Sequence, residues 1–366
     1  MAVSFRLELF PKSPEDLHRR LLPFITQQQL WGVNLPNKAK GELPDLLHHV
    51  QVLRAGIPST AAAGTADICV HYSIAQNYAR SADASFAALE EFACRLGAEV
   101  QQQHGHGSLS LLLVSGSQRR QLDTVAALQR LAASPRFRGL VPPLPLAVAF
   151  NPYFPDDVRQ AEERQRLRRK LEAGRGLVTA VYLQAGSDAD RLDQGLQFLR
   201  QLLDEEAGPA AAAAAAAQDD VRQPASMQAK SAEQQEALPL LPREEQHEQA
   251  AAPTKRARRQ QAGQQADVSA GIGGADTGPR PGCASRPAVY GSLLLPSKKL
   301  LAQMRFRPWG GVFLSDDYLS GVEEAEAATL RVLQVYRRHG VVPLVETEVA
   351  IEAELARLQS LLDVAC

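Results

Sequence analysis

Polar and apolar residues alternate at the start of the chain. In the stretch Ser4–Lys12, Arg6 and Glu8 are the polar positions between apolar residues. A period of two predicts a β-strand, and Pro11 ends it because proline cannot donate a ladder hydrogen bond. The next residues, Ser13–Asp16, combine a serine cap, a proline and two acids, which is typical of the start of a helix. The pattern therefore predicts a strand that leads directly into a helix.

The same alternation of strand and helix recurs along the chain. Predicted strands cover residues 4–12, 30–36, 67–74, 109–114, 146–150, 177–183, 288–295 and 341–347. Predicted helices cover residues 14–29, 43–53, 81–96, 121–132, 156–173, 188–203, 297–304, 325–339 and 349–364. Eight strand–helix units with short connections predict an α/β fold of the (β/α)8 (TIM) barrel type.

One long segment interrupts this pattern between the sixth helix and the seventh strand. Residues 206–285 contain a run of alanines, many Gln and Glu residues, a glycine-rich end and almost no large apolar residues. Such a segment buries too little surface to offset chain entropy, so we expect a disordered insertion. Residues 1–205 then supply strands one to six of the barrel, and residues 286–366 supply strands seven and eight with the closing helix.

Composition and charge narrow the classes of partner. The 366 residues are 45% hydrophobic and carry a net charge of −1, so bulk electrostatics favours neither a nucleic acid nor a membrane surface as partner. No apolar run is long enough for a transmembrane helix, and the early first strand leaves no room for a signal peptide. The four scattered cysteines have no zinc-site spacing and indicate reduced thiols, as expected in the cytoplasm. We therefore expect no metal site.

Five pieces of sequence carry a resemblance to a known family. Ser4–Lys12 is similar to the motif S-F-E-F-F-P-P-[KR], His71–Ile74 to H-L-T-C, and Val148–Pro152 to V-A-A-Y-P. Leu167–Gly174 is similar to L-K-x-K-x-x-A-G, and Gly291–Leu294 to the G-I-x-P region. In this order the motifs resemble the catalytic barrel of the methylenetetrahydrofolate reductase family.

The resemblance implies an FAD-dependent oxidoreductase of one-carbon metabolism. NAD(P)H would reduce the flavin, and the flavin would pass a hydride to the small-molecule substrate 5,10-methylenetetrahydrofolate. The protein would hold and tune the cofactor. The resemblance also leaves a homo-oligomer open.

The resemblance assigns the catalytic role to Glu8, as a general acid when the folate iminium forms. Such a role requires burial, because the carboxyl group must stay partly protonated near neutral pH. The alternative is a structural carboxylate in a salt bridge with Arg6 or Lys12. His71, at the end of its strand, would lie near the flavin, and its alternative is a hydrogen-bonded core histidine.

Six further residues are candidate cofactor-binding positions. The small residues of the loop after the fourth strand allow its backbone N–H groups to approach a phosphate or a flavin edge, although a plain turn is the alternative. The resemblance assigns Glu163 and Lys170 to the cofactor's ribose and phosphate. Lys170 also offsets its helix dipole, and its charged face is expected to be exposed. The six positions are Ser115, Gly116, Ser117, Asn151, Glu163 and Lys170.

The sequence departs from the family's pattern at four places. Ser115–Ser117 replaces R-G-D, Thr179–Ala180 replaces Thr-Gln, Asn151 replaces a tyrosine, and the second proline of F-P-P is missing. Two other functions therefore stay open. The barrel could be a catalytically inactive binding or scaffold protein, or a flavoenzyme that acts on another small substrate.

Overall fold

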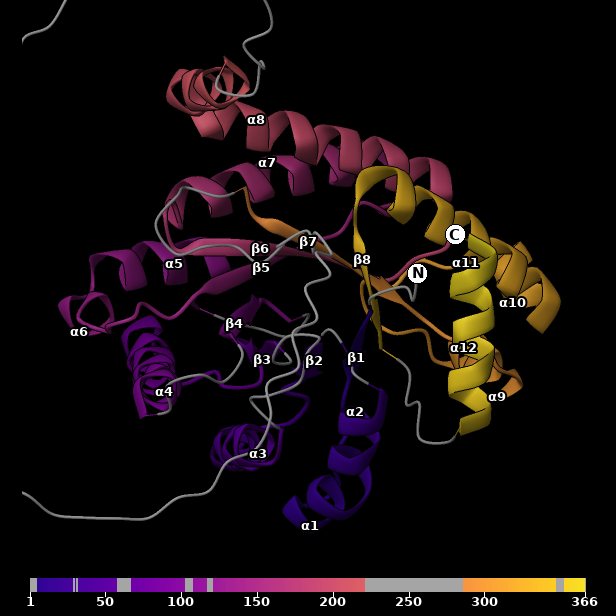
Figure 1. The fold of residues 1–366 in the computed structure, drawn as a ribbon, viewed down its shortest axis with the longest axis horizontal. Coiled ribbons are helices and arrows are strands. Elements are labelled where there is room, and N and C mark those ends of the chain that lie inside the picture. The colour runs from indigo at the N-terminus through magenta and orange to yellow at the C-terminus, as the bar shows by residue number, and fades with distance from the viewer. Residues whose placement is uncertain are drawn as a thin grey trace, which may run out of the picture. The chain divides into compact units, whose positions relative to one another are not determined.

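Eight parallel strands close into a barrel in chain order, as predicted (Figure 1). The computed structural model describes residues 5–28, 30, 32–57, 67–102, 108–116, 121–220, 286–346 and 352–365. The strands are β1 (Arg6–Glu8), β2 (Gly32–Leu35), β3 (Asp67–Ser73), β4 (Leu109–Val114), β5 (Leu146–Phe150), β6 (Val178–Leu183), β7 (Ala288–Leu293) and β8 (Val342–Val345). β1 closes the ring by pairing with both β2 and β8.

Helices lie outside the ring of strands (Figure 1). They are α1 (Pro14–Asp16), the π-helix η1 (Leu17–Leu21), α2 (Leu22–Gln28), α3 (Leu43–Gly56), α4 (Ala82–Gln102), α5 (Thr124–Ala133), α6 (Pro135–Arg138), α7 (Asp157–Ala173), α8 (Ala189–Asp220), α9 (Lys298–Phe306), α10 (Asp316–Ser320), α11 (Val322–His339) and α12 (Glu352–Ala365). Among the described residues, none of these helices has the length and apolar character needed to cross a membrane.

The chain divides into two units, and the first contains all eight strands. This unit comprises Met1–Pro209 together with Gly282–Cys366, and the second comprises Ala210–Pro281. Helix α8 continues through the alanine run to Asp220, where alanine's high helix propensity favours it. The rest of the predicted disordered insertion, residues 221–285, lies outside the described residues.

The apolar core forms mainly between the strands and the helices. In β1 the burial is explained by the alternation of the sequence, because Leu7 packs in the large core outside the barrel while Arg6 and Glu8 belong to the opposite face. A smaller apolar cluster fills the barrel interior, and it includes Tyr182, Tyr290 and Leu344. The polar face of β1 therefore lies inside the barrel.

Arg6 is fully buried in this interior, and its charge is compensated there. Its guanidinium pairs with the Asp67 carboxylate and donates from Nη2 to the carbonyl oxygen of Val33 over 3.1 Å. Its Cζ lies 4.7 Å from the ring centre of Tyr290. Gly32 leaves room for the guanidinium group, because a Cβ added at Gly32 would lie 2.5 Å from Nη1 of Arg6. A buried charge of this kind is tolerated only with such partners.

Candidate functional site

A cavity of about 200 Å³ opens at the carboxyl ends of the strands. All eight strands are parallel, so their carboxyl ends meet at one mouth of the barrel, where barrels of this type carry their active sites. The cavity is smaller than the roughly 300–1,000 Å³ of most ligand pockets, so it suits a small ligand or the reactive end of a larger one. Its polar lining residues are Glu8, Asn37, Lys38, His71, Ser73, Tyr182, Gln184, Ser292 and Glu346.

Glu8 lies at the end of β1 with 7% of its surface exposed. Its Oε1 is 3.2 Å from Nζ of Lys38, so the predicted alternative of a salt bridge with Arg6 or Lys12 names the wrong partner. Burial and the nearby Glu346 raise the pKa of Glu8 to about 8, although Lys38 opposes the shift. A carboxyl group with this pKa is largely protonated at neutral pH and can donate a proton.

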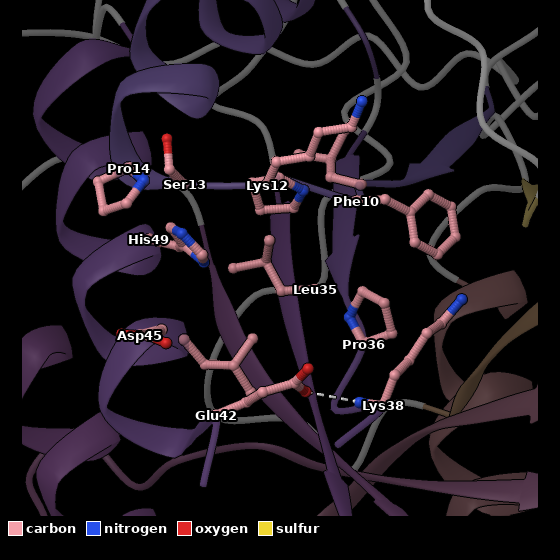
Figure 2. Close-up of a pocket in the computed structure, with 13 residues that line it drawn as sticks. Phe10, Lys12, Ser13, Pro14, Leu35, Pro36, Lys38, Glu42, Asp45 and His49 are labelled. Atoms are coloured by element: carbon pink, nitrogen blue, oxygen red, sulfur yellow. Dashed lines mark hydrogen bonds between the residues drawn. The ribbon is translucent and has the colours of Figure 1, made fainter. Parts of the chain in front are cut away.

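The loop between β2 and α3 places Lys38, and Glu42 holds that loop. Oε2 of Glu42 accepts hydrogen bonds from the backbone N–H groups of Lys38 and Ala39, at 2.8 and 2.9 Å, and from Nδ2 of Asn37 at 3.2 Å. Figure 2 shows the contact with Lys38, whose side chain extends away from Glu42 toward Phe10. Its Nζ lies 3.7 Å from the ring centre of Phe10. Glu42 thus fixes the backbone at Lys38, and the Phe10 ring lies against the ammonium group that meets Glu8.

Glu346 brings a second carboxyl group to the mouth, directly after β8. Its backbone N–H donates to the carbonyl oxygen of Leu293 over 2.9 Å, which continues the pairing of β8 with β7. The hydroxyl of Ser292, on β7, donates to its Oε1. Burial raises the pKa of Glu346, opposed by the Ser292 hydrogen bond and by Lys38.

His71, at the end of β3, is linked to the buried arginine by one side chain. Oδ1 of Asn34 accepts from Nε of Arg6 over 2.9 Å, which turns the amide so that its Nδ2 faces Nε2 of His71, also at 2.9 Å. Nε2 must then accept, and the proton of the neutral ring lies on Nδ1. Burial, with the charges of Lys38 and Arg6, lowers the pKa of His71 to about 3. The ring is therefore a neutral hydrogen-bonding group at the cavity wall.

The loop after β4 lies beside the mouth, and the structure describes two of its three predicted residues. Oγ of Ser115 is 2.7 Å from Oγ1 of Thr124. Gly116 has a φ of 72°, a conformation that glycine adopts easily. A Cβ at Gly116 would lie 2.6 Å from the Cβ of Ala75, so only a glycine lets the backbone come this close to Ala75. Ser117 lies outside the described residues.

Glu163 and Lys170 are buried between α7 and β5, and they face each other. Nζ of Lys170 donates to the carbonyl oxygen of Ala149 over 2.6 Å and lies 3.7 Å from Oε1 of Glu163. The expectation that the charged face of α7 exposes Lys170 is wrong, because only 5% of its surface is accessible. Asn151 binds on the same side, where its Nδ2 donates to the carbonyl oxygen of Gly311 over 2.8 Å. None of the three lines the mouth cavity.

These placements fit the flavin ring of an FAD molecule better than its ribose and phosphate groups. The mouth combines small apolar groups, such as Val114 and Ala149, with the polar groups of Asn37 and Gln184. That mixture suits a flat heterocyclic ring. The residues predicted for the ribose and phosphate are instead engaged with each other and with the backbone of β5, so they do not fit that role in this conformation.

A second cavity, of about 360 Å³, adjoins the first on the side of α3 (Figure 2). The two cavities share Pro36 and Lys38 in their walls. His49 of α3 lies in this wall with 6% of its surface exposed, and neither ring nitrogen has a hydrogen-bond partner among the described residues. Burial lowers the pKa of His49, so its ring is neutral there.

Sequence reasoning found Glu8 and His71 but missed other residues of the mouth. Three of them, Lys38, Gln184 and Glu346, lie at or just after the end of a predicted strand, which is the signal that identified Glu8. Ser292 lies within a predicted strand. Gln184 directly follows β6 and lies four positions beyond Ala180, the residue that stands where the family has its glutamine. Ala180 instead packs in the apolar interior of the barrel.

Comparisons with known proteins do not identify a family for this chain. No family model matches it, and no curated protein matches it either. In the part of the chain that the structure describes, no group of three or more His, Cys, Asp or Glu residues could hold a metal ion.

Proposed function

We propose that this chain is an enzyme that works at the mouth of the barrel, with Glu8 as its general acid. The observation that carries the proposal is a buried carboxyl group at the end of a barrel strand, facing a cavity. Burial keeps the proton on Glu8 near neutral pH. Lys38, 3.2 Å away, is placed to stabilise the carboxylate once the proton has left.

We propose further that the reaction is a reduction of the methylenetetrahydrofolate reductase type. The support is the resemblance of five motifs, together with a mouth that suits a flat ring. FAD, when bound, would supply the hydride that it takes from NAD(P)H. His71 and Gln184 offer neutral hydrogen-bonding groups to a ring, and Glu8 gives a proton to the folate substrate. The proposal places this reaction in the cytoplasm.

The second candidate function is a binding or scaffold protein. The inward pairing of Glu163 with Lys170 favours it, because these two residues leave the cofactor's phosphate side without its expected ligands. A scaffold would need no bound flavin and no proton donor at the mouth.

A visible absorption spectrum, recorded with FAD added to the purified protein, separates the two functions. A reductase is expected to bind FAD and to lose the flavin absorbance when NADPH or NADH is added without oxygen. Glu8→Gln should keep the flavin but abolish turnover of the folate, whereas the exposed Glu15→Gln should leave both unchanged. A protein that binds no FAD at micromolar concentration contradicts the reductase and favours the scaffold.

A further inference from the structure

The register of the barrel sets two carboxyl groups side by side. Arg6 pairs with Leu344 and Leu7 with Val345 across β1 and β8. The next position on each strand is a glutamate, Glu8 on one and Glu346 on the other. Neighbouring strands lie about 4.8 Å apart, and residues in register point to the same face. Both side chains line the mouth cavity, so the closure of the barrel brings two acids from opposite ends of the chain together.

The charges around this pair do not balance two carboxylates. Among the described residues that line the cavity, Lys38 is the cation, and its Nζ pairs with Glu8. Ser292 offers Glu346 a neutral hydroxyl, which supports a carboxylate without cancelling its charge. With both acids ionised, the mouth would hold one uncompensated negative charge in a largely buried site. Like charges this close disfavour double ionisation.

The other titratable groups near the pair do not change this balance at neutral pH. His71 is neutral because its pKa is lowered to about 3. The pKa values of Tyr182 and Tyr336 lie well above the ordinary value, mainly through burial, so both are neutral. Arg6 lies deeper in the barrel and pairs with Asp67. Among the described residues, the charged and titratable groups around the carboxyl pair are Arg6, Lys38, His71, Tyr182 and Tyr336.

We propose that Glu8 and Glu346 share one proton at neutral pH, and that Glu346 is a positioning residue that keeps Glu8 able to donate it. This assignment rests on the proposed role of Glu8 and extends it to a residue that the family resemblance does not single out. In the transfer, the O–H bond of Glu8 breaks and its electron pair stays on the carboxylate oxygen. A new N–H bond forms on a basic nitrogen of the substrate.

The pair also defines the chemical class of substrate that the mouth favours. After the transfer, both acids are carboxylates, and the substrate nitrogen carries a positive charge beside them. The neutral site before transfer and the anionic site after it therefore favour a substrate that binds as a neutral nitrogen base and becomes a cation. A substrate that becomes an anion at this point would meet two like charges.

Proton occupancy can be measured without any turnover. Protein labelled with ¹³C in its glutamate side chains is titrated from about pH 5 to about pH 9, and the two carboxyl resonances are assigned from Glu8→Gln and Glu346→Gln. We expect Glu346→Gln to lower the titration midpoint of Glu8 by about one unit or more, because the like charge is gone. Glu346→Asp keeps the charge and should restore the wild-type midpoint.

Two further variants keep the test decisive if Glu346→Gln does not fold. Ser292→Ala removes the hydroxyl that supports the Glu346 carboxylate, so the proton should move toward Glu346 and the Glu8 midpoint should fall. Glu15→Gln, a matched change at an exposed acid, should leave the Glu8 midpoint unchanged. The shared proton is overturned if the Glu8 midpoint stays the same in both Glu346→Gln and Ser292→Ala. It is also overturned if both carboxyl groups of the wild type titrate near the ordinary pKa of a glutamate.

The titration and the flavin spectrum test the carboxyl pair and the reductase function separately. A shared proton in a protein that binds no FAD would retain the carboxyl pair and reject the reductase. In an active enzyme, the rate falls as pH rises through the pKa of the acid. Glu346→Gln should then move that fall to lower pH by the same amount as the NMR midpoint, which a merely structural role would not do.

Discussion

The burial of Glu8 makes the stability of the barrel depend on pH, and Glu8→Gln removes the titrating group. The folded-state pKa of about 8 lies well above the ordinary value of 4.5. Because the folded protein binds this proton more tightly, the contribution to stability is complete below about pH 4.5. It is lost as pH rises through the folded pKa of about 8. At about 1.4 kcal/mol for each pH unit, the loss amounts to a few kcal/mol.

Denaturant unfolding of the wild type and Glu8→Gln at a series of pH values measures this loss. Glutamine has nearly the same shape but no proton to lose, so the wild type should lose a few kcal/mol relative to Glu8→Gln between about pH 5 and about pH 8. Glu15→Gln, at an exposed position, is the control for general charge effects. A free-energy difference between wild type and Glu8→Gln that stays constant over this range would refute a buried, proton-binding Glu8.

Two other predictions concern the polar interior below the mouth. Arg6→Leu should lower the free energy of unfolding by about 3 kcal/mol, since it leaves the half-buried Asp67 carboxylate without its cation. Arg6→Leu combined with Asp67→Leu should recover part of the loss in the same denaturant assay. The imidazole of His71 should show no protonation between about pH 5 and about pH 8 in an NMR titration, because its pKa is about 3, and a titration step near neutral pH would contradict its burial against Lys38 and Arg6.

Local patterns in the sequence were sufficient to predict the barrel. Apolar runs or alternating residues indicate each strand, and the spacing of apolar residues together with capping residues indicates each helix. Eight strand–helix units could therefore be counted without the structure. The alternation of Arg6 and Glu8 with leucines also indicated which side chains share a face. Periodicity is a local property of the backbone, and for this reason it can be read from one segment at a time.

The partners of the candidate site were decided only by the tertiary structure. Glu8 contacts Lys38 because Glu42 holds the loop between β2 and α3 at the mouth. Glu8 lies beside Glu346 because β8 closes the ring next to β1. Lys170, which the helix pattern left exposed, is instead buried against β5. Nothing in a single segment specifies such neighbours. The proton on Glu8 depends on burial and on nearby charges, and both exist only once the barrel has closed.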